Sequence, residues 1–173
     1  AHRLVRLGDV DAAGRLRLDA VARYLQDVAT DDAVDAGLQS AMSWVVRRTV
    51  IRVERTARFR EPLTLTTFAS GYGRSWAERR TVIRGEKGAE IDAAALWVSI
   101  DAASGRPAPL DEGFVRVYGE AVGGRKIRAR LAHPDPTPGL DREPWAVRVT
   151  DFDALDHVNN AVYWEVVEEH LAR

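Results

Sequence analysis

The sequence predicts an α+β fold in which one long helix packs against a consecutive antiparallel sheet. Between residues 19 and 36, Val21, Leu25 and Val28 recur at spacings of four and three, which places them on one face of a helix. From Trp44 onward the apolar period changes to two, as in strands with one buried face. Short, glycine-containing connections between the strand-like runs favour hairpins. A helical layer on a sheet is the two-layer α+β architecture.

Each further element has its own signal. Residues 3–8 alternate apolar and polar side chains, which predicts a short first strand. Asp19 is the expected N-cap of the helix over 19–36, because its carboxylate can accept the free amides of the first turn, and Gly37 is the expected end. A short helix is expected over residues 111–121. Four strands are expected between the two helices, over residues 44–60, 63–71, 75–84 and 90–100.

The strand over residues 44–60 has one apolar and one charged side. Odd-numbered residues such as Val45 and Ile51 are mostly apolar, whereas even-numbered residues such as Arg48 and Arg52 are mostly charged. The pattern predicts a half-buried strand, broken by a bulge, whose odd-numbered side faces the core.

Composition excludes several classes of function. The 173 residues carry 25 basic and 26 acidic side chains, and this balance argues against a nucleic-acid partner, whose affinity rests on excess positive charge. Cysteine is absent, which excludes a thiol nucleophile and a thiolate zinc site, and no metal or other cofactor is expected. No apolar run approaches the roughly 18–20 residues of a membrane span. Because the start does not resemble a signal peptide either, a cytoplasmic protein is predicted.

A short repeat indicates that the chain contains two copies of one fold. Residues 5–12 read VRLGDVDA and residues 147–154 read VRVTDFDA, with five of eight positions identical at an offset of 142. Both copies lead into a loop and then a helix. We expect a first domain over 1–122, a linker rich in proline and glycine over 123–143, and the start of a second domain over 144–173. The second copy is expected to be incomplete, because no strands follow its helix.

A run over residues 150–165, TDFDALDHVNNAVYWE, gathers groups suited to acyl chemistry. Asp153 could activate water or attack an acyl carbon directly. His157 could position water or carry a proton near neutral pH. A helix is expected to open after Asn159 and Asn160, and its unpaired amides could stabilise negative charge on a carbonyl oxygen. Together these groups suit the hydrolysis of an activated acyl group.

The same run resembles a known family pattern. The spacing D-x-D-x-x-x-H-V-N-N-x-x-Y, which ends at Tyr163, is similar to that of hot-dog thioesterases. The presence of two copies in one chain resembles the tandem hot-dog acyl-acyl-carrier-protein thioesterases of bacteria and plant plastids. The resemblance extends over most of the chain. In the first copy it includes the Asp9-Val10-Asp11 start, WVVRR at 44–48, WAERR at 76–80 and LWVSID at 96–101.

The resemblance implies a hot-dog fold, in which an antiparallel sheet wraps a long helix. It implies an enzyme of fatty acid biosynthesis that hydrolyses fatty acyl thioesters of acyl carrier protein without a cofactor. Asp153 then corresponds to the catalytic carboxylate and His157 to the family histidine. Asn159, Asn160 and Tyr163 are candidate substrate-binding residues. The alternative is a structural role for each residue. Asp153 would then be a loop carboxylate that caps turns, as in the first copy, and His157 a partly buried histidine with its hydrogen bonds satisfied. The two asparagines would cap the helix, and the tyrosine would pack in the core.

The sequence also departs from the family pattern. Plant members have an asparagine two residues before the histidine, where this chain has Leu155, and a downstream glutamate that would fall beyond Arg173. In the first copy, Arg15 stands at the histidine position and Arg17-Leu18 at the Asn-Asn positions. The first copy therefore lacks the candidate catalytic groups, and the resemblance implies that it shapes the acyl pocket instead. Three aromatic residues of its strands are candidates for lining that pocket: Trp44, Trp76 and Trp97.

Other functions remain open from the sequence. One alternative is another hot-dog enzyme of acyl thioesters, either an acyl-coenzyme A thioesterase or a hydratase. The other is a non-catalytic module that binds acyl thioesters. The expected partner is accordingly acyl carrier protein or a coenzyme A thioester. Hot-dog sheets present free edges, which is compatible with a homodimer.

Overall fold

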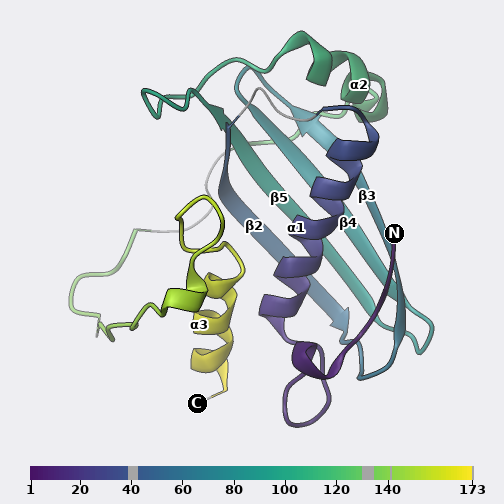
Figure 1. Cartoon of the computed structure of the whole chain (residues 1–173), viewed down its shortest axis with the longest axis vertical. Coiled ribbons are helices and arrows are strands. Elements are labelled where there is room, and N and C mark those ends of the chain that lie inside the picture. Colours follow the sequence, from purple (N-terminus) through teal and green to yellow (C-terminus); the bar gives the residue numbers. More distant parts are fainter. Residues whose placement is uncertain (39–42, 130–134, 141, 173) are drawn as a thin grey trace.

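An antiparallel sheet with a long helix across one face forms the framework of the molecule (Figure 1). The computed structural model describes residues 1–38, 43–129, 135–140 and 142–172. Within these residues five strands form one sheet in the order β1-β3-β4-β5-β2, and all neighbours are antiparallel, as the short connections predict. The strands are β1 (His2–Leu4), β2 (Ser43–Arg55), β3 (Pro62–Tyr72), β4 (Trp76–Gly85) and β5 (Glu90–Ile100).

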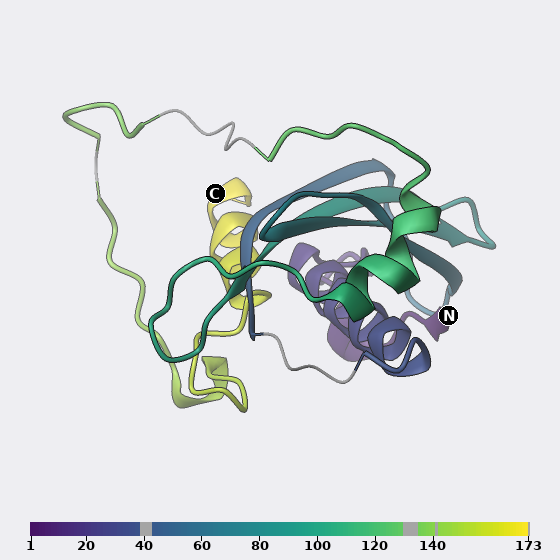
Figure 2. The ribbon, with the colours of Figure 1, turned by 90° about the horizontal axis from the view of Figure 1, so that it is seen from above.

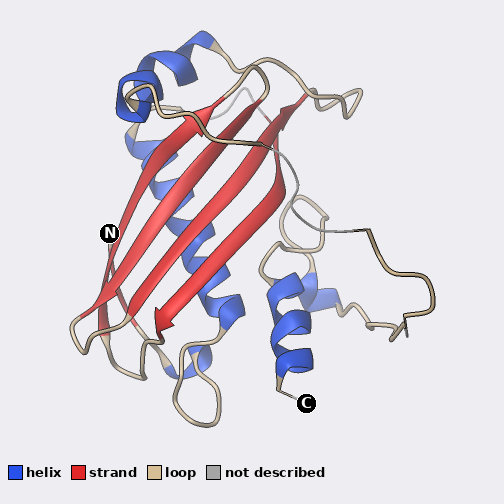
Figure 3. Cartoon of the chain, turned by 180° about the vertical axis from the view of Figure 1, so that it is seen from behind, coloured by secondary structure: helices blue, strands red, loops and turns tan. Residues whose placement is uncertain are grey.

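The helices occupy three places around this sheet. In the described part of the chain they are α1 (Leu18–Asp35), α2 (Glu112–Val122) and α3 (Val162–Leu171). α1 crosses one face of the sheet, α2 lies over one end, and α3 lies beside α1 on the side of β2 (Figures 1 and 2). Seen from behind, the sheet lies in front of α1 (Figure 3). None of the helices in the described ranges has the length and hydropathy of a membrane span.

The core forms between α1 and the sheet. The predicted apolar face of the helix is confirmed, because Val21, Val28 and Leu25 are 1%, 2% and 8% exposed. They belong to one cluster with buried residues of the strands, including Leu63 and Ile83. Full burial of a side chain of this size stabilises the fold by about 1.5–3 kcal/mol relative to exposure. This face therefore fixes α1 on the sheet.

The start of α1 differs from the prediction. The helix begins at Leu18 with Arg17 in the N-cap position, so Asp19 is not the cap. Asp19 is instead fully buried, where it accepts hydrogen bonds from the guanidinium groups of Arg17 and Arg23. Two charged donors hold the carboxylate more strongly than the backbone amides of the first turn would.

β2 is shorter than predicted, and its first residues face the other way. It ends at Arg55. Against β5 its register shifts between Val46 and Arg48, so the expected bulge is confirmed, and the side-chain parity changes there. Val45, which was expected to face the core, is therefore 44% exposed. Val46 takes the inward position and lines a cavity beneath α1.

α2 closes one end of the sheet. Its N-cap is Asp111, whose Oδ1 accepts a hydrogen bond from the Phe114 amide at 2.6 Å. The helix ends at Gly123, which adopts the left-handed conformation with φ 57°. Phe114 and the other buried residues of α2 pack against β3 and β4. The described residues between 123 and 148 form turns and irregular chain that lead to α3 (Figure 2).

Candidate functional site

The two copies of the sequence repeat share one loop conformation. The Arg148 amide donates to Asp151 Oδ2 at 2.8 Å, and the Arg6 amide donates to Asp9 Oδ2 at the same distance. In both copies the loop is then closed by an isolated β-bridge and followed by a helix. Each copy begins with a 3₁₀ turn, η1 (Leu7–Asp9) or η2 (Val149–Asp151). The repeat in sequence is therefore also a repeat in structure.

Asp153 and its counterpart Asp11 close these loops in the same way. Oδ1 of Asp153 accepts hydrogen bonds from the amides of Leu155 and His157, at 2.9 and 3.3 Å. Oδ1 of Asp11 accepts from the amides at the corresponding positions, at 2.8 and 2.9 Å. One oxygen of each carboxylate thus holds the turn.

The second carboxylate oxygen distinguishes the two copies. Oδ2 of Asp11 accepts from Nε of Arg15 at 2.8 Å, in an ion pair. The backbone hydrogen bond from Arg15 is the main reason that the pKa of Asp11 lies below its ordinary value. In the second copy His157 replaces this arginine, and within the described residues no donor bonds to Oδ2 of Asp153. In this part of the chain Asp153 therefore has one oxygen without a protein partner, whereas both oxygens of Asp11 are already hydrogen-bonded within its own loop.

His157 and Tyr163 lie at the rim of the site. Both side chains are exposed and line a large open cavity. The loop turns at Asp156, whose φ of 60° matches the φ of 72° at its counterpart Gly14. This left-handed turn brings the His157 carbonyl back to accept from the Asp153 amide at 2.9 Å. Tyr163 is 60% exposed in the described part of the chain, so it is not packed into the core that these residues form.

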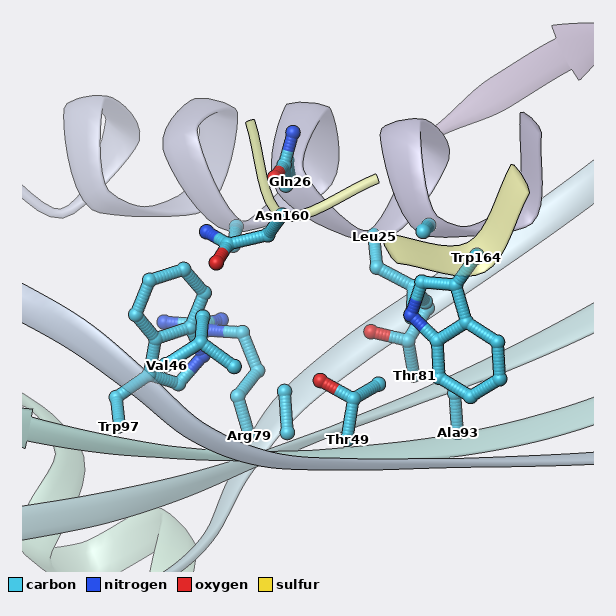
Figure 4. Close-up of a pocket in the computed structure, with 13 residues that line it drawn as sticks. Leu25, Gln26, Val46, Thr49, Arg79, Thr81, Ala93, Trp97, Asn160 and Trp164 are labelled. Carbon is cyan, nitrogen blue, oxygen red and sulfur yellow. The ribbon is translucent and has the colours of Figure 1, made fainter. Parts of the chain in front are cut away.

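Asn159 and Asn160 have different surroundings. Oδ1 of Asn159 accepts from the Ala161 amide at 2.9 Å, so this asparagine supports the turn that precedes α3. The same oxygen accepts from Nε2 of Gln26, on α1, at 3.1 Å. The Asn160 side chain points into the cavity toward Trp97 (Figure 4). The structure therefore gives Asn159 a structural contact and Asn160 a place on the cavity wall.

The cavity runs between α1, the inner face of the sheet and the start of α3. Trp44 and Trp97, two of the three aromatic candidates, line it. Trp76 is not among its lining residues and packs over Gly73, where a Cβ atom would come within 2.4 Å of the indole. Small side chains leave the space beneath α1: Ala22, Ala29, Ala93 and Ala95. Its walls suit an alkyl chain, because they are mostly apolar.

A polar network in the cavity wall was missed by the sequence reasoning. Nη1 of Arg79 on β4 donates to Oδ2 of Asp32 on α1 at 2.6 Å, and Nη2 donates to the Tyr118 hydroxyl of α2 at 3.1 Å. That hydroxyl donates to the same Asp32 oxygen at 2.6 Å. Burial, followed by the hydrogen bond to Asp32, raises the pKa of Tyr118 above its ordinary value. The signal was present, since Arg79 has the inward parity of Ala77 and Thr81 on a half-buried strand.

Arg148 forms ion pairs with two carboxylates of the second copy, those of Asp151 and Glu165. Hydrogen bonds from its side chain and its amide hold the pKa of Asp151 below the ordinary value. Its Nη2 also pairs with Glu165 of α3 at 2.5 Å, which ties the 3₁₀ turn to the helix. In the described part of the chain, no three potential ligands are grouped to hold a metal ion.

Comparison with known families places this loop and cavity in context. The N-terminal domain family of acyl-acyl-carrier-protein (acyl-ACP) thioesterases matches residues 2–118, and the corresponding C-terminal domain family matches residues 139–173. The chain belongs to the acyl-ACP thioesterase family. Two uncharacterized proteins of Mycobacterium tuberculosis, from strains CDC 1551 and H37Rv, are each 29% identical to it over 166 residues. Those matches cover 95% of this chain and 66% of the relatives, so the chain spans about two thirds of their length.

Solved structures of acyl-ACP thioesterases share the hot-dog fold of this chain. An acyl-ACP thioesterase from Bacteroides thetaiotaomicron superposes with a TM-score of 0.78 at 21% identity, over 98% of this chain and 71% of that protein. The 12:0-ACP thioesterase from Umbellularia californica superposes with a TM-score of 0.76 at 21% identity, over 98% of this chain and 73% of that one. The predicted fold is thus confirmed.

Proposed function

We propose that the protein hydrolyses acyl thioesters, with acyl carrier protein as the carrier of the acyl group. The observation that carries this proposal is the difference between the two aspartate loops. Asp11 has both oxygens occupied, whereas Asp153 presents an oxygen without a cationic partner beside an apolar cavity. Membership of the acyl-ACP thioesterase family supports the choice of reaction and of carrier.

In the proposed mechanism the acyl chain occupies the cavity and the thioester carbonyl lies near the start of α3. Asp153 acts as the base that activates water, or as the nucleophile. His157 positions water and transfers a proton to the departing thiolate. Asn160 and the positive end of the α3 dipole stabilise negative charge on the carbonyl oxygen. If Asp153 is the base, water adds to the acyl carbon and the C–S bond breaks. If Asp153 is the nucleophile, its oxygen displaces the thiolate to form an acyl-aspartate anhydride, which water then hydrolyses. Both routes yield a fatty acid and a free thiol.

Binding of the chain follows from the apolar cavity. Each methylene removed from water contributes about 0.8 kcal/mol, so a longer alkyl chain binds more tightly until it reaches the polar network. Arg79 and Asp32 form an ion pair in the wall, and an alkyl group placed against it would compete with the solvation of both charges. Tyr163 at the rim is proposed to contact the part of the substrate that leads to the carrier.

Thiol release from a panel of acyl-ACP and acyl-coenzyme A thioesters tests the proposal. None of the 173 residues is cysteine, so a thiol-reactive dye has no background from this chain. We expect Asp153→Asn to lower turnover by about 10²–10⁴-fold, the usual contribution of a general base. Asp11→Asn is the matched control, because it alters the equivalent loop of the first copy, and it should leave turnover near the wild-type value.

Three outcomes contradict parts of this proposal. Equal turnover of wild type and Asp153→Asn would remove Asp153 from the mechanism. Preference for coenzyme A thioesters would overturn the assigned carrier. Tight binding of acyl-ACP with no thiol release from any thioester would show a binding module instead of an enzyme.

A further inference from the structure

The equivalent helices of the two copies, α1 and α3, make reciprocal contacts with each other. Gln26 on α1 and Glu168 on α3 occupy equivalent positions, at the same offset of 142 that relates the two loops. Nε2 of Gln26 donates to Asn159 at the start of α3, at 3.1 Å. Oε2 of Glu168 accepts from the Leu18 amide at the start of α1, at 3.0 Å. Each helix thus reaches the beginning of the other.

The two reciprocal contacts differ in charge. On the first copy, the carboxylate of Glu168 takes the first amide of α1, where Arg17 provides no side-chain cap. Burial raises the pKa of Glu168 above its ordinary value, and the hydrogen bond from Leu18 partly opposes that effect. The first copy therefore has an acidic group of the protein itself at its helix start. The second copy has the neutral amide of Gln26 in the equivalent place.

The neutral amide of Gln26 helps to orient Asn159 at the start of α3. Oδ1 of Asn159 accepts from both Gln26 and the Ala161 amide, so its orientation is fixed from two sides. The Asn159 amide in turn donates to the Asp151 carbonyl at 2.8 Å, which connects it to the loop of Asp153. Gln26 and Asn160 lie on the wall of the same cavity (Figure 4).

We propose that Gln26 is a positioning residue that the first copy contributes to the candidate active site of the second. It holds Asn159, and through Asn159 it sets the place of Asn160 and of the loop that carries Asp153. Its neutrality keeps a carboxylate away from the atoms on which negative charge develops. This inference rests on the proposed thioesterase function. It also accounts for the location of the candidate site in the second copy, since the carboxylate of Glu168 lies at the start of α1 in the first copy.

The substitution Gln26→Glu tests the inference most sharply. It retains the size of the side chain but replaces the amide donor by a carboxylate facing Asn159 Oδ1. Asn159 could reverse its amide to donate to the new carboxylate, but would then lose the bond from Ala161. Either way the start of α3 is disturbed and gains negative charge. Glu168→Gln is the matched control, because its carbonyl oxygen can still accept from Leu18 and the contact that changes lies at the start of α1, in the first copy.

The readouts are kcat, KM and their pH dependence in the full chain, with the preferred thioester. A displacement of about 1 Å at a reacting centre can cost roughly 100-fold in rate, so we expect Gln26→Glu to lower kcat by at least about tenfold. KM should rise by a smaller factor than the factor by which kcat falls. The ratio of variant to wild-type kcat should rise toward one as the pH falls, because the introduced carboxylate becomes neutral. Gln26→Ala should lower kcat at every pH, and Glu168→Gln should leave it near the wild-type value.

Two results would overturn the inference. One is an unchanged kcat in both Gln26 variants. The other is a loss in Gln26→Glu that is constant with pH and accompanied by an equal loss in Glu168→Gln, because that pattern indicates general damage to the contact between the helices.

A binding measurement separates this inference from the proposed function. If the wild type releases no thiol, the thioesterase proposal fails and kcat gives no answer. The affinity for acyl carrier protein bearing an amide-linked acyl group then decides. The inference requires weaker binding by Gln26→Glu, relieved at lower pH, and unchanged binding by Glu168→Gln. Equal affinity of all three proteins would overturn it.

Discussion

At the scale of single residues, Asp19 shows how charge partners decide the role of a carboxylate. Its side chain is fully buried between Arg17 and Arg23, whose side chains are 35% and 39% exposed. Burial by itself would raise the pKa of Asp19, but the hydrogen bonds from both arginines outweigh it and leave the pKa below its ordinary value. The ionised form therefore stabilises the folded state.

Substitution of Asp19 by asparagine should reveal this contribution. We expect the free energy of unfolding at pH 7 to fall by about 1–3 kcal/mol, because two guanidinium groups lose a charged acceptor. Since the pKa is lower in the folded state, the stabilisation is present above the ordinary value of 3.8 and is lost as the pH falls through the folded-state value. Urea unfolding between pH 7 and pH 3 measures it. The gap between the two proteins should narrow in acid, and a gap independent of pH would contradict the assignment.

At the scale of elements, the apolar periodicity predicts the type and extent of each helix and strand better than it predicts the contacts of individual side chains. The five predicted strands and the three predicted helices are all present, and most of the predicted ends lie within two residues of the observed ones. The first strand was predicted over residues 3–8 but ends at Leu4, because a 3₁₀ turn follows at Leu7–Asp9. The exceptions have local causes, such as the bulge that turns Val45 outward. Asp153, His157 and Asn160 were found because they are contiguous in one loop. Gln26 and Arg79 were missed because other elements bring them to the cavity, and their spacing in sequence carries no such information.

The network of Arg79, Asp32 and Tyr118 joins three elements at the wall of the cavity. It links β4 to α1 and α2, and Arg79 also stacks on the Tyr118 ring at 5.2 Å. Phe114 packs against the same ring with centroids 4.9 Å apart. The network therefore helps to fix the position of α2 over the end of the sheet.

Removal of the Tyr118 hydroxyl should weaken this junction. We expect Tyr118→Phe to lower the free energy of unfolding by about 1–2 kcal/mol, because Asp32 and Arg79 each lose a hydrogen-bond partner. In a chain of this size that corresponds to a fall in Tm of roughly 2–8 °C. Thermal unfolding followed by circular dichroism measures it. Tyr163→Phe is the control, since this tyrosine is 60% exposed, and it should leave Tm within about 1–2 °C.

At the scale of the whole molecule, the two copies bury equivalent residues differently. Val21 and Leu25 form the core face of α1 against the sheet. Their counterparts at the offset of 142 are Tyr163 and Val167 on α3, which are 60% and 43% exposed. Leu171 extends the same stripe one turn further and is 75% exposed. β2 forms an edge of the sheet, and such an edge can pair with a strand of another molecule. The homodimer stays a prediction.

Equivalent substitutions in the two helices should therefore have unequal effects in the 173-residue chain. Leu25→Asp places a carboxylate in the core and removes a large apolar side chain, which should lower the free energy of unfolding by about 3–5 kcal/mol. Val167→Asp changes a half-exposed position and should cost less than about 1 kcal/mol. Urea unfolding of both variants at two protein concentrations measures the difference. Comparable losses would show that the apolar stripe of α3 is covered in solution, and a loss that grows with protein concentration would identify a second copy of the chain as the cover.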